Sequence, residues 1–225
     1  MATMDRTMDR TISDILIRSR QTLLEILEDR GYDTTTYRNI SPDQILTLAT
    51  GHPRALDVIV PKREGSPAPC DRAVVTYMIQ DRIKGRLGTI VRDIYEESSN
   101  EAVVATISRK DDVIIIMNEP AHDAFDKASL QLWQTQKARL TFFHIKQVVV
   151  HLGRHVLVPP HRKLNDEEAK AEIERLHITQ RAQLPLIKYH DIQSRLMGLV
   201  PGDLVEIIRP SPTAGVMRYI RLCAA

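Results

Sequence analysis

The sequence predicts an α/β (α+β) protein made of two domains, and three observations lead to this fold class. Segments rich in β-branched residues alternate with amphipathic helical segments between residues 12 and 136. A long β-rich run follows near residues 140–150, and the remaining chain consists of short segments separated by proline and glycine. We therefore expect a layered α/β domain over residues 1–145 and a small α+β domain over residues 146–225.

Two helices are expected at the start of the chain. Apolar residues at helical spacing predict a helix over residues 12–30, with Thr11 as its N-cap in a capping box and Gly31 as its C-terminal stop. Pro42 suits the first position of a second helix, and Gly51 marks its end. These helices precede the strands of the first domain.

The rest of the chain is read from composition and from turn residues. Asn165 is expected to cap a helix whose first turn is acidic, as the helix dipole favours. Residues 204–208 and 217–222 are expected to pair as a hairpin. The remaining expected elements are strands at 55–60, 73–79, 102–107, 113–117, 140–145 and 148–150, and helices at 87–97 and 121–136.

Four histidines, at 144, 151, 155 and 161, raise the question of a metal site. His151 and His155 would share one face of a helix, but the neighbouring valines favour a strand. In a strand, residues four apart are about 13 Å apart, so one ion would need a bend in the chain. Surface histidines are the simpler interpretation, and we expect neither a metal nor a cofactor.

One enzymatic alternative is a metal-dependent nuclease built on Asp57, which falls on an expected strand. Such a site needs an acidic residue followed two positions later by lysine. Residues 1–160 contain no such pair, and Glu168-Ala169-Lys170 falls on the expected helix of the other domain. Phosphate-binding loops and the common hydrolase motifs are also absent from the sequence. We expect no catalytic residue and no small-molecule ligand.

Charge and hydropathy narrow the possible partners. The net charge is +2, far from the strong excess of a free-standing nucleic-acid-binding regulator, which nevertheless stays open as a second alternative. No apolar run approaches the roughly 18 residues of a membrane span. The two cysteines, Cys70 and Cys223, have no metal-binding spacing, and a reducing compartment fits them best.

A series of short motifs between residues 143 and 222 carries a resemblance to a known family. They are His155-Val156-Leu157-Val158-Pro159-Pro160-His161, Gln183-Leu184-Pro185-Leu186-Ile187, Asp191, Arg195, Gly198-Leu199, Gly202, Val205, Ile207-Ile208-Arg209-Pro210-Ser211, Thr213-Ala214-Gly215 and Arg221-Leu222. In this order and spacing they resemble the fifth common subunit of the eukaryotic nuclear RNA polymerases, whose C-terminal domain corresponds to a whole small subunit of the archaeal RNA polymerase. Asp29-Arg30-Gly31-Tyr32 is similar to the end of that family's first helix.

The resemblance implies a non-catalytic subunit of a multisubunit DNA-directed RNA polymerase. The domain at residues 146–225 would then be an assembly domain that docks on the largest polymerase subunit and on other polymerase subunits. A rigid proline-containing turn and small residues also suit an interface. The residues expected to bind partners are Leu184, Pro185, Arg209, Ser211, Thr213, Ala214, Gly215 and Arg221.

By the same resemblance, the domain at residues 1–145 would be a jaw near downstream DNA, with Asn118, Pro120 and Ala121 on a DNA-facing loop. The family has Thr-Pro-Ser where this chain has Glu119-Pro120-Ala121. A carboxylate in this loop would repel phosphate, so any DNA contact is expected to be weak. The resemblance implies the nucleus for a cellular eukaryotic protein, and the host cytoplasm or the virion for a viral one.

Overall fold

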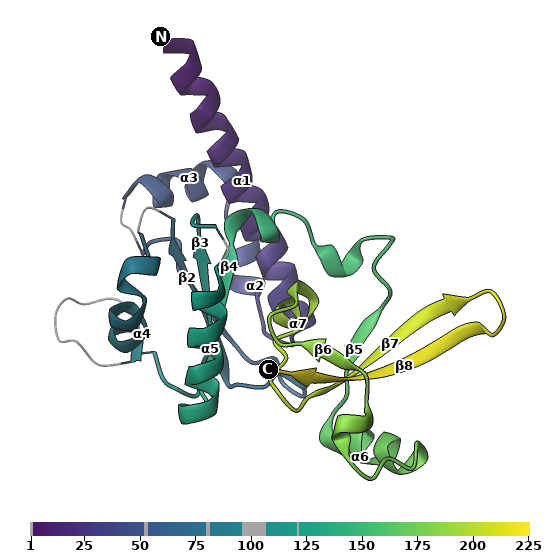
Figure 1. Cartoon of the computed structure of the whole chain (residues 1–225). Helices are drawn as coiled ribbons and strands as arrows, with labels where there is room; N and C mark the ends of the chain where they lie inside the picture. Colours follow the sequence, from purple (N-terminus) through teal and green to yellow (C-terminus); the bar gives the residue numbers. More distant parts are fainter. Residues whose placement is uncertain (1, 52–53, 80–81, 96–106, 121) are drawn as a thin grey trace. The chain divides into compact units, whose positions relative to one another are not determined.

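The computed structural model describes the chain except for residues 1, 52–53, 80–81, 96–106 and 121, and it divides into two compact units (Figure 1). The first unit is Met1–Val150 and the second is His151–Ala225. Both combine helices with a four-stranded sheet. The α+β fold class predicted from the sequence is confirmed.

The sheet of the first unit has the strand order β1-β2-β3-β4. Its strands are β1 (Val58–Pro61), β2 (Arg72–Met78), β3 (Asp112–Met117) and β4 (Arg139–His144), and only the β1–β2 pair is antiparallel. All six residues of β3 are buried, as expected for a central strand covered on both faces. The strand expected at residues 102–107 falls almost wholly outside the described residues.

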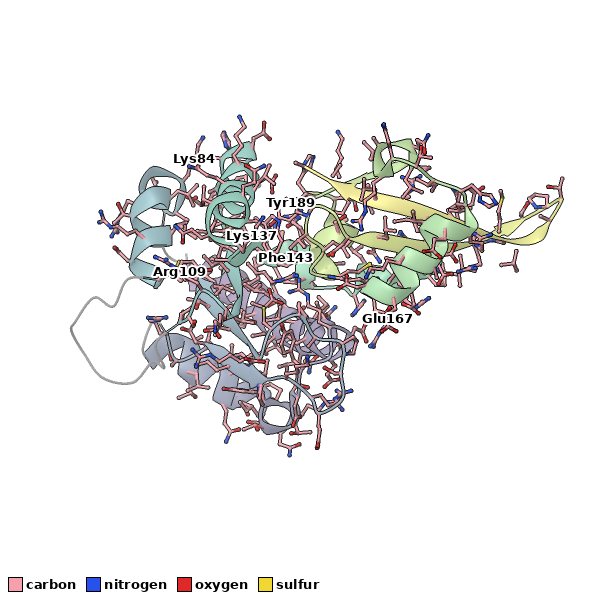
Figure 2. All side chains as sticks on the ribbon, turned by 90° about the horizontal axis from the view of Figure 1, so that it is seen from below. Lys84, Arg109, Lys137, Phe143, Glu167 and Tyr189 are labelled. Atoms are coloured by element: carbon pink, nitrogen blue, oxygen red, sulfur yellow. The ribbon has the colours of Figure 1, made fainter. Side chains whose placement is uncertain are left out.

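Helices cover both faces of this sheet. Alternate β3 residues, Val113 and Ile115 among them, pack with α4 (Leu87–Tyr95) and α5 (Asp123–Gln136) in one apolar cluster. Asp112, which is on the other face of the same strand, contacts the segment that follows α1 (Ala2–Asp29). Phe143, also fully buried, lies inside this unit (Figure 2). The sequence expectation of a layered α/β unit is met.

The start predicted for the first helix is wrong. Helix α1 begins at Ala2, because residues 2–10 contain neither glycine nor proline and nothing interrupts the helix before Thr11. Its predicted end is confirmed: Gly31 has φ +96°, and a Cβ there would lie 2.6 Å from Ser66 Oγ. A short helix, α2 (Thr35–Arg38), follows, and α3 (Pro42–Gly51) has the predicted bounds.

The strand predicted at residues 148–150 is also wrong. After β4 the chain forms two 3-10 helices, η2 (Ile145–Val148) and η3 (Leu152–Arg154). His144 and Gln147 satisfy the backbone at the start of η2 through a capping box, so the chain needs no neighbouring strand there. Val148 is fully buried in this turn, which is why a valine-rich run does not specify a strand.

The second unit contains a sheet of order β5-β7-β8-β6. Asn165 caps α6 as predicted, and together with Glu168 it forms a capping box. The predicted hairpin forms and is longer than expected. The elements are β5 (His161–Lys163), α6 (Asp166–Arg175), η4 (Arg181–Gln183), β6 (Leu186–Lys188), α7 (Ile192–Leu196), β7 (Leu204–Ser211) and β8 (Gly215–Ala224). Among the described residues of the whole chain, no helix combines the length and apolar character needed to cross a membrane.

Candidate docking site

The hairpin of β7 and β8 is the largest feature of the second unit. Its register runs from Leu204 opposite Leu222 to Ser211 opposite Gly215. The neighbouring strands pair only with its base, since β5 contacts β7 at Val205–Ile207 and β6 contacts β8 at Leu222–Ala224. The outer part of the hairpin, residues 208–218, therefore extends beyond both neighbours (Figure 1).

The turn of the hairpin brings together four of the residues expected to bind partners. Ser211 Oγ accepts a hydrogen bond from the Ala214 N–H at 3.3 Å and lies 3.3 Å from Thr213 Oγ1. Gly215 has φ +69°, and a Cβ built there meets no atom within 4 Å. Glycine is thus favoured by backbone conformation rather than by space.

Three further expected residues lie on the strands and on the segment before β6. The Arg209 guanidinium lies 5.6 Å from the ring centre of Tyr219, and Arg221 Nη1 donates to the Leu186 carbonyl at 3.2 Å. Pro185 is exposed. Leu184 differs from these residues, because it is 6% exposed and packs in the core of the unit. The structure thus places Leu184 in the core rather than on the surface of the unit.

A ladder of ion pairs stabilises the base of the hairpin. Glu206, on β7, accepts hydrogen bonds from Arg218 on β8 and, at 3.0 Å, from Arg162 on β5. Arg218 also reaches Glu172 of α6 at 2.9 Å. Burial tends to raise the pKa of Glu206, but the hydrogen bonds from the two arginines outweigh it and hold the pKa below its usual value. The ladder joins three strands and a helix into one rigid module.

Two exposed aliphatic residues next to the sheet were not among the expected site residues. Val156 is 91% exposed and Leu157 is 83% exposed. Their turn is ordered: the Val158 N–H donates to the His155 carbonyl at 2.9 Å, and the Leu157 N–H donates to His155 Nδ1 at 3.2 Å. They belong to one of the motifs that carry the resemblance, so the sequence contained a signal, but apolar character alone does not show exposure.

The outer hairpin adds three more exposed aliphatic side chains. Ile208 is 39% exposed, Val216 is 66% exposed and Met217 is 44% exposed. Residue 208 is linked to the end of the Val156–Leu157 loop, because its N–H donates to the Pro160 carbonyl at 3.1 Å. Folded proteins rarely leave several large aliphatic side chains so exposed on ordered backbone unless a partner covers them.

The histidines do not form a metal site in the described part of the chain. His151 and His155 flank η3, so the strand expected there is absent and the two residues lie at the ends of a turn. No group of three His, Cys, Asp or Glu side chains suitable for a metal ion occurs among the described residues.

The loop expected to face DNA lies at the end of β3. Asn118 and Pro120 are exposed, whereas Ala121 lies outside the described residues. Glu119 Oε2 accepts a hydrogen bond from the N–H of Lys84 at 2.9 Å, so the carboxylate that replaces the family's hydroxyl is held by a neighbouring segment.

Asp57, the candidate nuclease residue, performs a structural task. It lies just before β1 and forms an ion pair with Arg54 at 3.1 Å, while one of its oxygens accepts from the Tyr77 N–H at 3.3 Å. Burial raises its pKa, against the effect of Arg54. Asp111 and Asp112 are also paired with arginines. No group of three His, Cys, Asp or Glu side chains that includes Asp57 is suited to a metal ion among the described residues.

Comparisons with known proteins agree with the motifs of the second unit. The family model described as RNA polymerase Rpb5, C-terminal domain, matches residues 150–223. The chain is 54% identical over 72 residues to the DNA-directed RNA polymerase subunit Rpo5 of Pyrococcus abyssi, which covers 32% of this chain and 87% of that protein. It is 28% identical over 211 residues to the DNA-directed RNA polymerases I, II, and III subunit rpabc1 of Dictyostelium discoideum, which covers 92% and 96% of the two chains. A similar subunit of Caenorhabditis elegans is 27% identical over 212 residues, 91% of this chain and 92% of the relative. On this match of sequence and motif, the chain belongs to the Rpb5 family of DNA-directed RNA polymerase subunits.

Proposed function

We propose that this chain is a non-catalytic, structural subunit of a multisubunit DNA-directed RNA polymerase, and that its second unit docks on the largest subunit. The observation that carries this proposal is the exposure of Val156 and Leu157 on an ordered turn beside the projecting hairpin. Burying an aliphatic side chain of this size contributes about 1.5–3 kcal/mol, so two of them are useful anchors. A rigid scaffold reduces the entropy lost on docking.

The docking surface that we propose contains the Val156–Leu157 turn and the outer hairpin. It includes the expected partner-binding residues Arg209, Ser211, Thr213, Ala214 and Gly215, with Pro185 and Arg221 nearer the base. Interfaces commonly combine a few apolar anchors with arginines and a polar rim. The same composition is present here in one module.

The first unit would act as a jaw near downstream DNA. Support comes from the long match to the polymerase subunit of Dictyostelium discoideum, which covers 92% of this chain. Asn118, Pro120 and Ala121 would face the DNA, and the neighbouring Glu119 would keep the contact weak. The names of the two eukaryotic relatives, subunits of polymerases I, II and III, favour a nuclear location. A viral protein would instead act in the host cytoplasm or in the virion.

Affinity purification of the full chain tests the docking role. The chain should co-purify with two very large polymerase subunits, and the double substitution Val156→Ser with Leu157→Ser should reduce this recovery about tenfold or more. Leu176→Ser, at a partly exposed leucine after α6, is the matched control and should leave recovery unchanged. Recovery of the chain alone, with steeply salt-dependent DNA binding, would contradict the subunit role and favour a free-standing regulator.

A further inference from the structure

The hydrogen-bond pattern of the hairpin shows which backbone groups point away from it. The Ile208 N–H donates to Pro160 and the Leu222 N–H donates to Pro185, so both groups point out of the hairpin, toward β5 and β6 respectively. Backbone N–H directions alternate along a strand. The backbone N–H groups of the even-numbered residues in both strands therefore point out of the hairpin. The N–H of the odd-numbered Cys223 donates to the Asp203 carbonyl on the opposite side of the hairpin, so it points inward, as the alternation requires.

The outward edge of β7 cannot donate beyond Ile208. The next residue with the same orientation is Pro210, opposite Val216, and proline has no N–H. Proline is a common device for protecting an edge strand from pairing with another chain. An added strand would therefore find acceptors but no free donor along the outer part of β7.

The outward edge of β8 pairs with no strand between Val216 and Leu222, although Ile220 is itself only 7% exposed. Strand β6 covers this edge only from Leu222 onward, and the Val216 N–H is used within the turn by the Ala214 carbonyl. Within the second unit, all of whose residues are described, no strand pairs with the outward groups of Arg218 and Ile220. The edge thus offers two donors and their alternating carbonyl groups to an extended chain.

The side chains beside this edge indicate the charge of the occupant. Arg209, Met217, Tyr219 and Arg221 share one face, because residues directly opposite in the register point to the same side. The described residues provide no salt bridge to Arg209 or Arg221. On the other face, Arg218 is already bound to Glu206 and Glu172. The available face is cationic and partly apolar.

We infer that the edge of β8 between Val216 and Ile220 receives, as an added strand, an extended segment of a partner polymerase subunit that carries carboxylates. Backbone pairing with Arg218 and Ile220 would hold the segment, and its carboxylates would lie near Arg209 and Arg221. This inference rests on the proposed function, because it names the contact by which docking occurs. Strand addition at this edge would fix the register of the bound segment and the side of the hairpin on which it binds.

Hydrogen–deuterium exchange at single amides tests the inference, with the full chain measured free and within the purified polymerase. The amides of Arg218 and Ile220 should exchange at least about tenfold more slowly in the complex. The amides of Met217 and Tyr219, which already point into the hairpin, are the internal control and should change much less. Unchanged exchange at Arg218 in a polymerase that contains the chain would overturn strand addition while the subunit role stands.

Two other outcomes of the exchange experiment are also decisive. Protection of Arg218 in the free chain at high concentration, without polymerase, would show that a second copy occupies the edge and would overturn the inference. Failure to recover the chain with any polymerase subunit would instead reject the proposed function itself. The two failures are therefore distinguishable.

Two substitutions at position 218 distinguish the contribution of the backbone N–H to docking from that of the side chain. Arg218→Ala removes the ion pairs but keeps the N–H, whereas Arg218→Pro removes both. Recovery of the Pro variant with the polymerase should be about tenfold lower than that of the Ala variant, since one backbone hydrogen bond is of that order. Equal recovery of two folded variants would overturn the inference. If the Pro variant unfolds more readily in urea than the Ala variant, the exchange experiment decides.

Discussion

Arg30 and Asp112 form an ion pair inside the first unit, 2.8 Å apart, with side chains only 1% and 2% exposed. The Tyr32 hydroxyl donates to the same carboxylate at 3.2 Å, and burial raises the pKa of this tyrosine. Such a pair need not be more stabilising than apolar residues would be, but removing one partner leaves a buried charge. The pair therefore ties the segment after α1 to the central strand.

Asp112→Ala should lower the free energy of unfolding of the first unit by about 3–5 kcal/mol. Urea unfolding followed by the fluorescence of Trp133, the single tryptophan, measures this unit. Asp14→Ala breaks an exposed pair with Arg18 and should cost below about 1 kcal/mol. A similar small cost for Asp112→Ala would show that the buried pair does not stabilise the unit.

The stability of the second unit should fall in acid. The pKa values of Glu206 and Glu172 lie below their usual value of 4.5 because arginines donate to both carboxylates. A lowered folded-state pKa gives a stabilising contribution that is complete above 4.5 and is lost as the pH falls through the folded pKa. Thermal unfolding between neutral and acidic pH, followed by circular dichroism, measures the effect. Glu206→Gln should make the midpoint depend less on acid, and an unchanged pH profile would contradict this assignment.

The hairpin turn depends on the backbone conformation at Gly215. Gly215→Val should destabilise the second unit by about 1–3 kcal/mol, because a β-branched residue tolerates positive φ poorly. Gly215→Asn is the matched variant and should cost less, since asparagine adopts this conformation more readily. Thermal unfolding compares the two. Equal losses would indicate that side-chain bulk, rather than φ, limits this position.

Helices and turns with local signals were predictable, whereas elements defined by distant contacts were not. Interactions between residues that are close in sequence determine three of these features: the helix end at Gly31, the helix cap at Asn165 and the hairpin turn. Strands β5 and β6 have three residues each and exist only by pairing with the hairpin, so they are too short to show a periodic signal. The valines at 148–150 predicted a strand that is absent, because a buried position in a 3-10 turn favours the same apolar residues as a buried position in a strand.

In the candidate site, too, the features set by local sequence were predictable and those set by distant contacts were not. Ser211, Thr213, Ala214 and Gly215 were expected together and form one turn, because the turn is local. The burial of Leu184 and the exposure of Val156 and Leu157 depend on the packing of the whole unit, and an apolar residue type is compatible with either. Only the three-dimensional arrangement distinguishes a core leucine from an anchor.

The two units should be separable. A match of 72 residues spans 87% of the Pyrococcus abyssi subunit, so a chain of nearly the length of the second unit is a whole subunit there. A fragment of residues 151–225 should unfold cooperatively with the same thermal midpoint as the second unit in the full chain. A fragment of residues 146–225 should gain no stability, because Val148 is buried and the Val149 carbonyl is bonded by Thr22 within the first unit. An unfolded 151–225 fragment would show that the second unit depends on the first.

Pro210 also affects what happens to the protein before it meets a partner. An edge that can pair on both sides allows copies to add one after another into a fibril, as open sheets do. The projecting part of this hairpin has a donor-bearing edge on β8 only, so two copies that met through β8 would leave no second donor-bearing edge on the hairpin itself. Association through the hairpin would then stop at a pair. A chain produced in excess over its partners can thus remain available for assembly instead of being lost to aggregation.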